Sequence, residues 1–287
     1  MRGDSMTQQN GHLSVVSTPI GNLGDLSSRA GDVLAKSDIL ACEDTRMTRK
    51  LLSLCGIQTK AKLLPYHDHN GQTMRPKLIA AMQAGKAVAL VSDAGTPLVS
   101  DPGYKLVAAC HEFDIQVNAV PGPSAVLAGL AIAGLPSDRF LFAGFVPATT
   151  NAALATFQAF AALPVTSIWF DSPKRLAGNL ALMQEVFGNR LAVVAREMTK
   201  LYESYQRDCL AELAAFYASA AAPKGEIVIL VSGADPGHAT FDDDALRLML
   251  REELCAHSLR DAVKTVTEIS GKPRKYIYAL AIEIGKE

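Results

Sequence analysis

The stretch that decides the fold is Val91-Ser92-Asp93-Ala94-Gly95-Thr96-Pro97-Leu98-Val99-Ser100-Asp101-Pro102-Gly103. The apolar run Ala87–Val91 leads into it and is typical of a buried strand in a parallel sheet. Residues 104–111 follow with a helical pattern. The loop therefore lies at the carboxyl end of a strand, where open α/β sheets bind ligands. Its two glycines allow close backbone approach and its two prolines stiffen it, so we predict a ligand site rather than a simple capped turn.

Strands and helices alternate along most of the chain. Strands are expected at residues 13–16, 39–42, 87–91, 116–120, 140–143, 165–170, 191–195 and 227–231. Helical patterns fall between most of them, which is typical of α/β domains. We expect one α/β domain over residues 12–144 and a second over residues 145–238, joined by a linker at 144–150.

The two ends of the chain differ from the α/β region in composition and expected secondary structure. Residues 1–11 are polar and are expected to form a disordered tail. Residues 239–287 are expected to form a small C-terminal helical unit, with helices at 242–254, 258–269 and 273–284. Residues 258–278 carry five basic side chains against two acidic ones. This pattern fits a helix-turn-helix module that binds nucleic acid, and it fits a bundle that caps the second domain equally well.

The composition limits the classes of function. The chain has 287 residues, of which 49% are hydrophobic, and a net charge of -1. A nucleic-acid partner would therefore have to be bound by local basic patches. The five cysteines are scattered without CxxC pairs, which indicates a reducing compartment and no zinc site. The sequence shows no apolar stretch of about 20 residues, so we expect a cytoplasmic protein without a membrane span.

Two further loops resemble the central one in composition. Thr18-Pro19-Ile20-Gly21-Asn22-Leu23-Gly24-Asp25 follows the first expected strand, and Pro121-Gly122-Pro123-Ser124-Ala125 precedes a helix. Neither has the GxGxxG spacing of a nicotinamide site. Each loop alone fits an ordinary helix cap, but three such loops at the ends of strands in one sheet favour a shared site.

Charged and histidine side chains are ambiguous. Arg46, Arg49 and Lys50 stand near the start of a helix, where they oppose its dipole. They are explained either by a phosphate-bearing partner or by a solvated helix face. His67 and His69 have no evident third ligand, so we expect a polar turn there and no metal.

Together these loops resemble the tetrapyrrole (corrin/porphyrin) methylase family, and within it the branch that acts on ribosomal RNA. Four further motifs carry the resemblance, in order, so that it spans about residues 13–232: Glu43-Asp44-Thr45-Arg46, Asp171-Ser172-Pro173, Arg196-Glu197 with Thr199-Lys200, and Lys224-Gly225-Glu226. Members that act on tetrapyrroles have Gly-Pro-Gly-Asp in the first loop and Gly-Asp-Pro in the central loop. This chain has Pro19-Ile20-Gly21-Asn22 and Gly95-Thr96-Pro97 there instead, which disfavours a porphyrinoid substrate.

The resemblance implies a two-domain α/β, tetrapyrrole-methylase-like fold (class III methyltransferase) and a homodimer. It also implies that S-adenosyl-L-methionine binds between the domains. The methyl group would be transferred to the ribose 2′-oxygen of a cytidine in the decoding region of 16S ribosomal RNA, within the small ribosomal subunit. Carried over by motif, the residues expected to contact the methyl donor are Ile20, Asp93, Ala94, Gly95, Thr96, Pro97, Val99, Ser124, Ala125, Asp171 and Gly225.

A ribose hydroxyl is a poor nucleophile at neutral pH, so a base or a cation beside it is expected. One candidate set is Glu43 and Asp44 with Arg46, which would otherwise form a helix cap and an ion pair. The other is Lys200 and Glu203, which would otherwise form a surface or dimer-interface pair. Lys200 could act as a base only if its pKa were lowered.

Ribosomal RNA would be bound by exposed basic side chains, and the binding would weaken with salt. The candidates are Arg46, Arg49, Lys50, Lys174, Arg175, Arg274 and Lys275. Two other functions remain open: carbon methylation of a porphyrin or corrin, and a non-catalytic RNA-binding assembly factor that retains a donor pocket.

Overall fold

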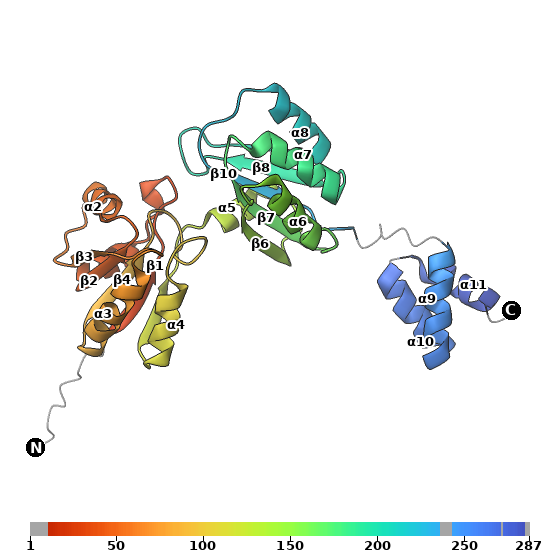
Figure 1. The fold of residues 1–287 in the computed structure, drawn as a ribbon, viewed down its shortest axis with the longest axis horizontal. Coiled ribbons are helices and arrows are strands. Elements are labelled where there is room, and N and C mark those ends of the chain that lie inside the picture. The colour runs from red at the N-terminus through yellow and green to blue at the C-terminus, as the bar shows by residue number, and fades with distance from the viewer. Residues whose placement is uncertain (1–10, 236–242, 271, 285–287) are drawn as a thin grey trace, which may run out of the picture.

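The computed structural model describes residues 11–235, 243–270 and 272–284. Its first sheet has the strand order β3-β2-β4-β1-β5, and every neighbouring pair is parallel. The strands are β1 (His12–Val16), β2 (Ile39–Cys42), β3 (Lys62–Pro65), β4 (Ala87–Val91) and β5 (Gln116–Val120). The parallel strand expected at Ala87–Val91 is confirmed, and it occupies the centre of the sheet (Figure 1).

Helices cover both faces of this sheet. They are α1 (Ser28–Lys36), α2 (Thr45–Leu54), α3 (Gly71–Gln83) and α4 (Tyr104–Glu112), with a short 3₁₀ turn, η1 (Leu23–Asp25), after β1. Val88 and Leu90 pack in the core that includes α3 and α4, whereas Ala89 and Val91 pack in the core that includes α1 and α2. Because both faces are covered, β4 is apolar at every position.

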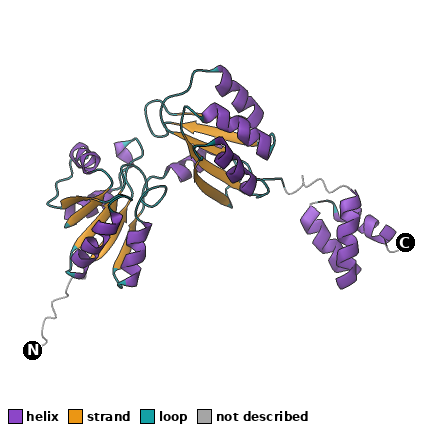
Figure 2. Ribbon diagram, in the orientation of Figure 1, coloured by secondary structure: helices purple, strands orange, loops and turns teal. Residues whose placement is uncertain are grey.

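The second sheet is mixed, in the order β6-β7-β10-β8-β9. Its strands are β6 (Phe140–Phe145), β7 (Thr166–Asp171), β8 (Leu191–Arg196), β9 (Ser204–Cys209) and β10 (Ile227–Val231). Only β6 and β7 are parallel; the other pairs are antiparallel. Figure 2 shows the two sheets separated along the chain, each with its own helices.

One face of the second sheet is covered by α6 (Thr150–Phe160), α7 (Leu176–Phe187) and α8 (Leu210–Ser219). Its core is centred on Trp169, which meets the ring of Phe157 edge-on at 5.1 Å. The other face is covered by α5 (Ala125–Ala133), which packs against Ile168 and Leu230. Helix α5 thus begins at the edge of the first sheet and ends in the core of the second.

Three strand predictions need correction. The strand expected to end the first domain, β6, extends to Phe145 and pairs with β7, so it belongs to the second sheet. The domain boundary expected at residue 144 and the linker expected to begin there therefore fall too late in the chain. Hydrophobic periodicity identifies a strand but not the sheet that it joins. Strands β3 and β9 were not expected. Both are edge strands, and β9, with the sequence Ser-Tyr-Gln-Arg-Asp-Cys, is too polar to show an apolar run.

The C-terminal helices are α9 (Asp243–Ala256), α10 (Leu259–Ser270) and α11 (Arg274–Ile284). They pack together around Leu250, Val266 and Ile277, as expected for a small helical unit. Figure 1 shows this unit beyond the second domain, on the side away from the first. The tail expected at residues 1–11 lies almost wholly outside the described residues, as does the boundary expected at 238. Among the described helices, none is long and apolar enough to cross a membrane.

Candidate active site

Three loops at the carboxyl edge of the first sheet are joined by hydrogen bonds. The backbone N–H of Thr18 donates to the carbonyl of Gly95 at 2.9 Å, and the N–H of Gly95 donates back at 3.0 Å. The hydroxyl of Thr96 donates to the carbonyl of Pro123 at 3.0 Å and lies 2.9 Å from the hydroxyl of Ser17. The predicted convergence of the three loops is therefore confirmed.

The central loop turns through several left-handed residues. Gly95, Leu98, Ser100 and Gly103 have φ values of +78°, +76°, +62° and +144°. Leucine and serine adopt this conformation only at a cost in energy, which the surrounding structure must offset. A Cβ at Gly95 would lie 3.3 Å from Cγ2 of Ile20, so the first loop packs directly on this turn.

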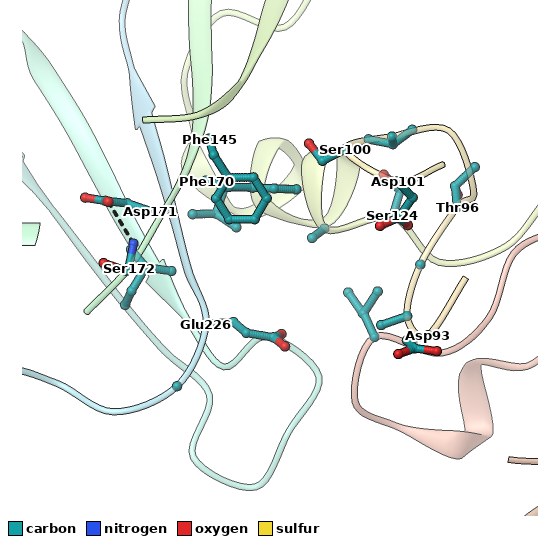
Figure 3. A pocket seen from close by; sticks show the side chains of 18 of the residues that line it. Asp93, Thr96, Ser100, Asp101, Ser124, Phe145, Phe170, Asp171, Ser172 and Glu226 are labelled. Atoms are coloured by element: carbon teal, nitrogen blue, oxygen red, sulfur yellow. Dashed lines mark hydrogen bonds between the residues drawn. The ribbon is translucent and has the colours of Figure 1, made fainter. Parts of the chain in front are cut away.

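A cavity of about 430 Å³ lies between the two domains. Its size falls in the usual range for small-molecule sites. Figure 3 shows Asp93, Thr96, Ser100, Asp101 and Ser124 on the wall formed by the first domain and α5. The opposite wall comes from the second sheet and its loops, with the labelled residues Phe145, Phe170, Asp171, Ser172 and Glu226. A polar, acidic wall thus faces one that carries two aromatic rings, Phe145 and Phe170, with apolar and polar side chains beside them.

Three carboxyl groups gather on the first wall: Glu43 after β2, Asp93 after β4, and Asp101 in the central loop. Burial raises the pKa of Glu43 and of Asp93 above their ordinary values. Burial, with repulsion from Glu43 and Asp93, raises the pKa of Asp101 to about 6, against a hydrogen bond from Ser92 that lowers it. This wall therefore attracts cations and can exchange a proton near neutral pH.

Asp44 is a helix cap and not a member of this group. Its carboxylate accepts the N–H of Arg46 at 2.8 Å, and the Arg46 guanidinium pairs with it at 2.7 Å. These hydrogen bonds lower the pKa of Asp44 to about 2. A carboxylate with so low a pKa is a weak base. Of the first candidate set, only Glu43 lines the cavity.

Lys200 and Glu203 also lie outside the cavity lining. The Lys200 ammonium lies 2.8 Å from Glu197 and 3.0 Å from Glu226, and Glu203 accepts the N–H of Thr199 at 2.5 Å. Burial alone would lower the pKa of Lys200, but the hydrogen bonds to both glutamates outweigh it, and the pKa is raised. Lys200 therefore lacks the lowered pKa that a lysine base requires. Lys200 instead holds Glu226, which does line the cavity.

The buried Asp171 and the half-buried Arg175 form a polar cluster at the second wall. Asp171 accepts the N–H of Ser172 at 2.7 Å and the side-chain amide of Asn179 at 2.8 Å, and burial raises its pKa. Arg175 lies 3.4 Å from Asp171 and donates to the carbonyl of Pro147 at 2.8 Å. The Arg175 guanidinium is thus engaged within the domain, and its binding to RNA stays a prediction.

With this geometry established, we compared the chain with known proteins. The family model for Tetrapyrrole (Corrin/Porphyrin) Methylases matches residues 12–214. The chain belongs to this family. Among its curated relatives is Ribosomal RNA small subunit methyltransferase I of Mesorhizobium japonicum, 46% identical over 95% of this chain and 92% of the relative. The protein of the same name from Vibrio cholerae is 44% identical over 98% of each chain.

Solved structures of other proteins share the fold of this tetrapyrrole methylase. One is the uroporphyrin-III C-methyl transferase from Thermus thermophilus, solved in complex with S-adenyl homocysteine. It has a TM-score of 0.54 and 17% identity, and the match covers 77% of this chain and 97% of the other. At this identity the likeness supports the fold alone, and it agrees with the predicted fold class.

In this methylase, nearly all residues expected to contact the donor line the cavity; Pro97 is the exception. The predicted residues found there are Ile20, Asp93, Ala94, Gly95, Thr96, Val99, Ser124, Ala125, Asp171 and Gly225. The lining residues that the sequence analysis did not name as donor contacts are Glu43, Ser100, Asp101, Phe145, Phe170, Ser172, Pro173, Glu226, Ile227 and Val228. Ser100 and Asp101 lie in the same loop as the predicted contacts Gly95 and Thr96, so the composition of that loop was a signal for them as well. Phe145 had no such signal, because it fell in an expected linker.

The other basic candidates of this methylase are exposed. Arg46, Arg49 and Lys50 lie on α2, Lys174 lies before α7, and Arg274 and Lys275 open α11. They are therefore free to meet a large anionic partner, although Arg46 also pairs with Asp44. No group of three or more metal-ligating side chains is poised to hold a metal in the described part of the chain.

Proposed function

We propose that this methylase transfers a methyl group from S-adenosyl-L-methionine to the ribose 2′-oxygen of a cytidine in the decoding region of 16S ribosomal RNA. The names of the near-full-length relatives support a ribosomal RNA substrate of the small subunit. The observation that carries the proposal is the cavity between the domains, with an acidic wall facing an apolar surface around Phe145, Phe170, Ile227 and Val228. It offers separate surfaces to the charged and the apolar parts of the donor.

The residues present fit this donor. Phe170, Ile227 and Val228 give an apolar surface suited to a nucleobase. The carboxylate of Asp93 faces the same space and favours a positively charged group. The left-handed turn at Gly95 lets the backbone form part of the wall without a side chain. All the predicted contacts except Pro97 line this cavity, which supports their proposed role in holding the donor.

When bound, the donor supplies a methyl group activated by a positively charged sulfur. The chain's own contribution is mainly alignment, because an in-line displacement depends on holding the two reacting atoms in register. The loops joined at Thr18 and Gly95 fix one wall. The ion pair between Lys200 and Glu226 fixes part of the other. A ribose hydroxyl entering between them would meet the carboxyl groups of the first wall.

We also propose that the enzyme works as a homodimer in the cytoplasm and binds the small ribosomal subunit through its exposed basic side chains. Leu201 and Tyr202, in the loop before β9, are 88% and 70% exposed. Neighbouring apolar side chains with this exposure are typical of a surface covered by another protein. Light scattering of the wild type and of Leu201→Glu tests the dimer: the variant is expected to be monomeric.

The catalytic proposal is tested with radiolabelled donor and small ribosomal subunits that lack the modification. We expect label in 16S ribosomal RNA, and nucleoside mass spectrometry is expected to recover 2′-O-methylcytidine. Label on a cytosine ring would correct the acceptor atom. Tight binding and methylation of a porphyrin would favour the tetrapyrrole alternative. RNA binding without any methyl transfer would identify an assembly factor.

A further inference from the structure

Asp101 is one of two carboxylates of the central loop, with Asp93, that face the cavity. The preceding Ser100 has a left-handed backbone, and the following Pro102 has a fixed φ. This constrained backbone holds Asp101 on the wall that also carries Ser124, across the cavity from Phe145 (Figure 3). Asp101 was not among the candidate bases expected from the sequence.

The two neighbouring carboxylates, Asp93 and Glu43, interact with the backbone of the loops after β2 and β4. Asp93 accepts the backbone N–H of Asp44 at 3.1 Å, which ties the end of β4 to the end of β2. Glu43 interacts with the backbone N–H of Asp93, which lowers the pKa of Glu43 against the effect of burial. Asp101, by comparison, interacts with the hydroxyl of Ser92. Of the three, Asp101 is therefore the carboxylate that can take up a proton without loosening the joint between the strands.

We propose that Asp101 is the catalytic base that takes the proton of the attacking ribose hydroxyl, an inference that rests on the function proposed above. The ribose O–H bond breaks as its proton passes to a carboxylate oxygen of Asp101. The electron pair left on the ribose oxygen forms the new bond to the methyl carbon. The bond from that carbon to sulfur breaks with its electron pair kept by sulfur, which becomes a neutral thioether. Asp101 then releases the proton to solvent.

The surroundings of Asp101 suit this task. A general base works best when its pKa is near the operating pH, and the pKa of Asp101 is raised to about 6 by burial and by the charges of Glu43 and Asp93. Asp68 and His67 act one step further away, on Glu43. Asp101 must be ionised to accept a proton, so activity should be full above about pH 6 and fall below it.

The decisive comparison is Asp101→Asn against Glu43→Gln and an exposed control, Asp138→Asn. Single-turnover methyl transfer to small subunits is measured from pH 5 to pH 9, with donor affinity measured by calorimetry. We expect Asp101→Asn to lose about 100- to 10,000-fold in rate and to lose the step near pH 6, with donor affinity within threefold of wild type. Glu43→Gln should keep the step but move it to lower pH, because one repelling charge is gone. Asp138→Asn should match the wild type.

A second readout does not depend on activity. In protein labelled with ¹³C at the aspartate carboxyls, one resonance should titrate near pH 6 without substrate and should be missing from Asp101→Asn. A rate for Asp101→Asn within threefold of wild type overturns the inference. So does a tenfold loss of donor affinity, which would make Asp101 a donor contact. If the wild type methylates no ribose, the proposed function itself fails and this inference with it, whereas ribose methylation that survives in Asp101→Asn overturns only the inference.

Discussion

Gly21 of the first domain lies directly against the side chain of Lys200 in the second. A Cβ added at Gly21 would lie 2.4 Å from Cγ of Lys200 and 2.9 Å from Oγ1 of Thr199. Lys200 cannot swing aside freely, because its ammonium is held by Glu197 and Glu226. This contact therefore limits how closely the two domains can approach beside the cavity.

Gly21→Ala is expected to push these two loops apart and weaken donor binding. Because part of the clash is with a side chain whose far end is fixed, we expect a loss of about tenfold in affinity, or about 1.4 kcal/mol, by calorimetry. Gly31→Ala in α1 is the matched control, since the added Cβ would lie 3.7 Å from Ile57, an ordinary contact. Equal affinities of the two variants would show that the contact does not set the cavity.

Lys200→Arg separates a structural role from a catalytic one. Arginine keeps the positive charge that pairs with Glu197 and Glu226, but it does not lose its proton in proteins. We expect methyl transfer within about threefold of wild type and an unchanged pH profile, where threefold equals about 0.65 kcal/mol. Loss of activity with donor affinity intact would restore Lys200 as a base.

Gly95→Val tests the cradle formed by the central loop. Gly95 has a φ of +78°, and valine there would both strain the backbone and direct its methyl groups toward Ile20. Gly56→Val is matched for strain, because Gly56 has a φ of +65° and open space around its Cβ position. Both variants should lose about 1–2 kcal/mol of stability. Only Gly95→Val should lose donor binding, by more than tenfold in calorimetry.

Asp101→Asn should make the protein more stable at neutral pH. The pKa of Asp101 is about 6 in the folded state against an ordinary value of 3.8, so its ionisation opposes folding above pH 6. Asparagine removes that cost, which we put at about 1–2 kcal/mol because the group is partly solvated. The gain should be full above pH 6 and shrink as the pH falls toward 4. Urea unfolding at pH 8 and pH 4.5 measures it, and an equal gain at both would refute the assignment.

Arg274→Ala with Lys275→Ala tests whether the C-terminal unit binds RNA. Both residues are exposed in the first turn of α11. If each contacts a phosphate, the logarithmic salt slope of subunit binding should fall by about 1.5. The double variant of two exposed lysines on the first domain, Lys36→Ala with Lys77→Ala, is the control and should leave the slope unchanged. If Arg274→Ala with Lys275→Ala left the salt slope of subunit binding unchanged, the C-terminal helices would have a structural role and would not bind RNA.

Much of the first domain could be predicted because its signals are local. The buried strand Ala87–Val91 was recognised from its unbroken apolar run, and Asp44 caps a helix as its position suggests. The loops of the site were recognised because glycine and proline are required where a backbone turns sharply. These features depend on residues close together in the chain, so the sequence by itself determined them.

The tertiary structure decided which elements meet. Phe140–Phe145 has the same strand pattern whichever sheet it joins, and only its pairing with β7 places Phe145 in the cavity. Asp101 and Lys200 were both plausible as charged surface residues. Burial beside Glu43 and Asp93 raised the pKa of Asp101, and two glutamates, Glu197 and Glu226, raised that of Lys200. A pKa depends on charges and burial brought together from distant parts of the chain, and no local pattern encodes that proximity.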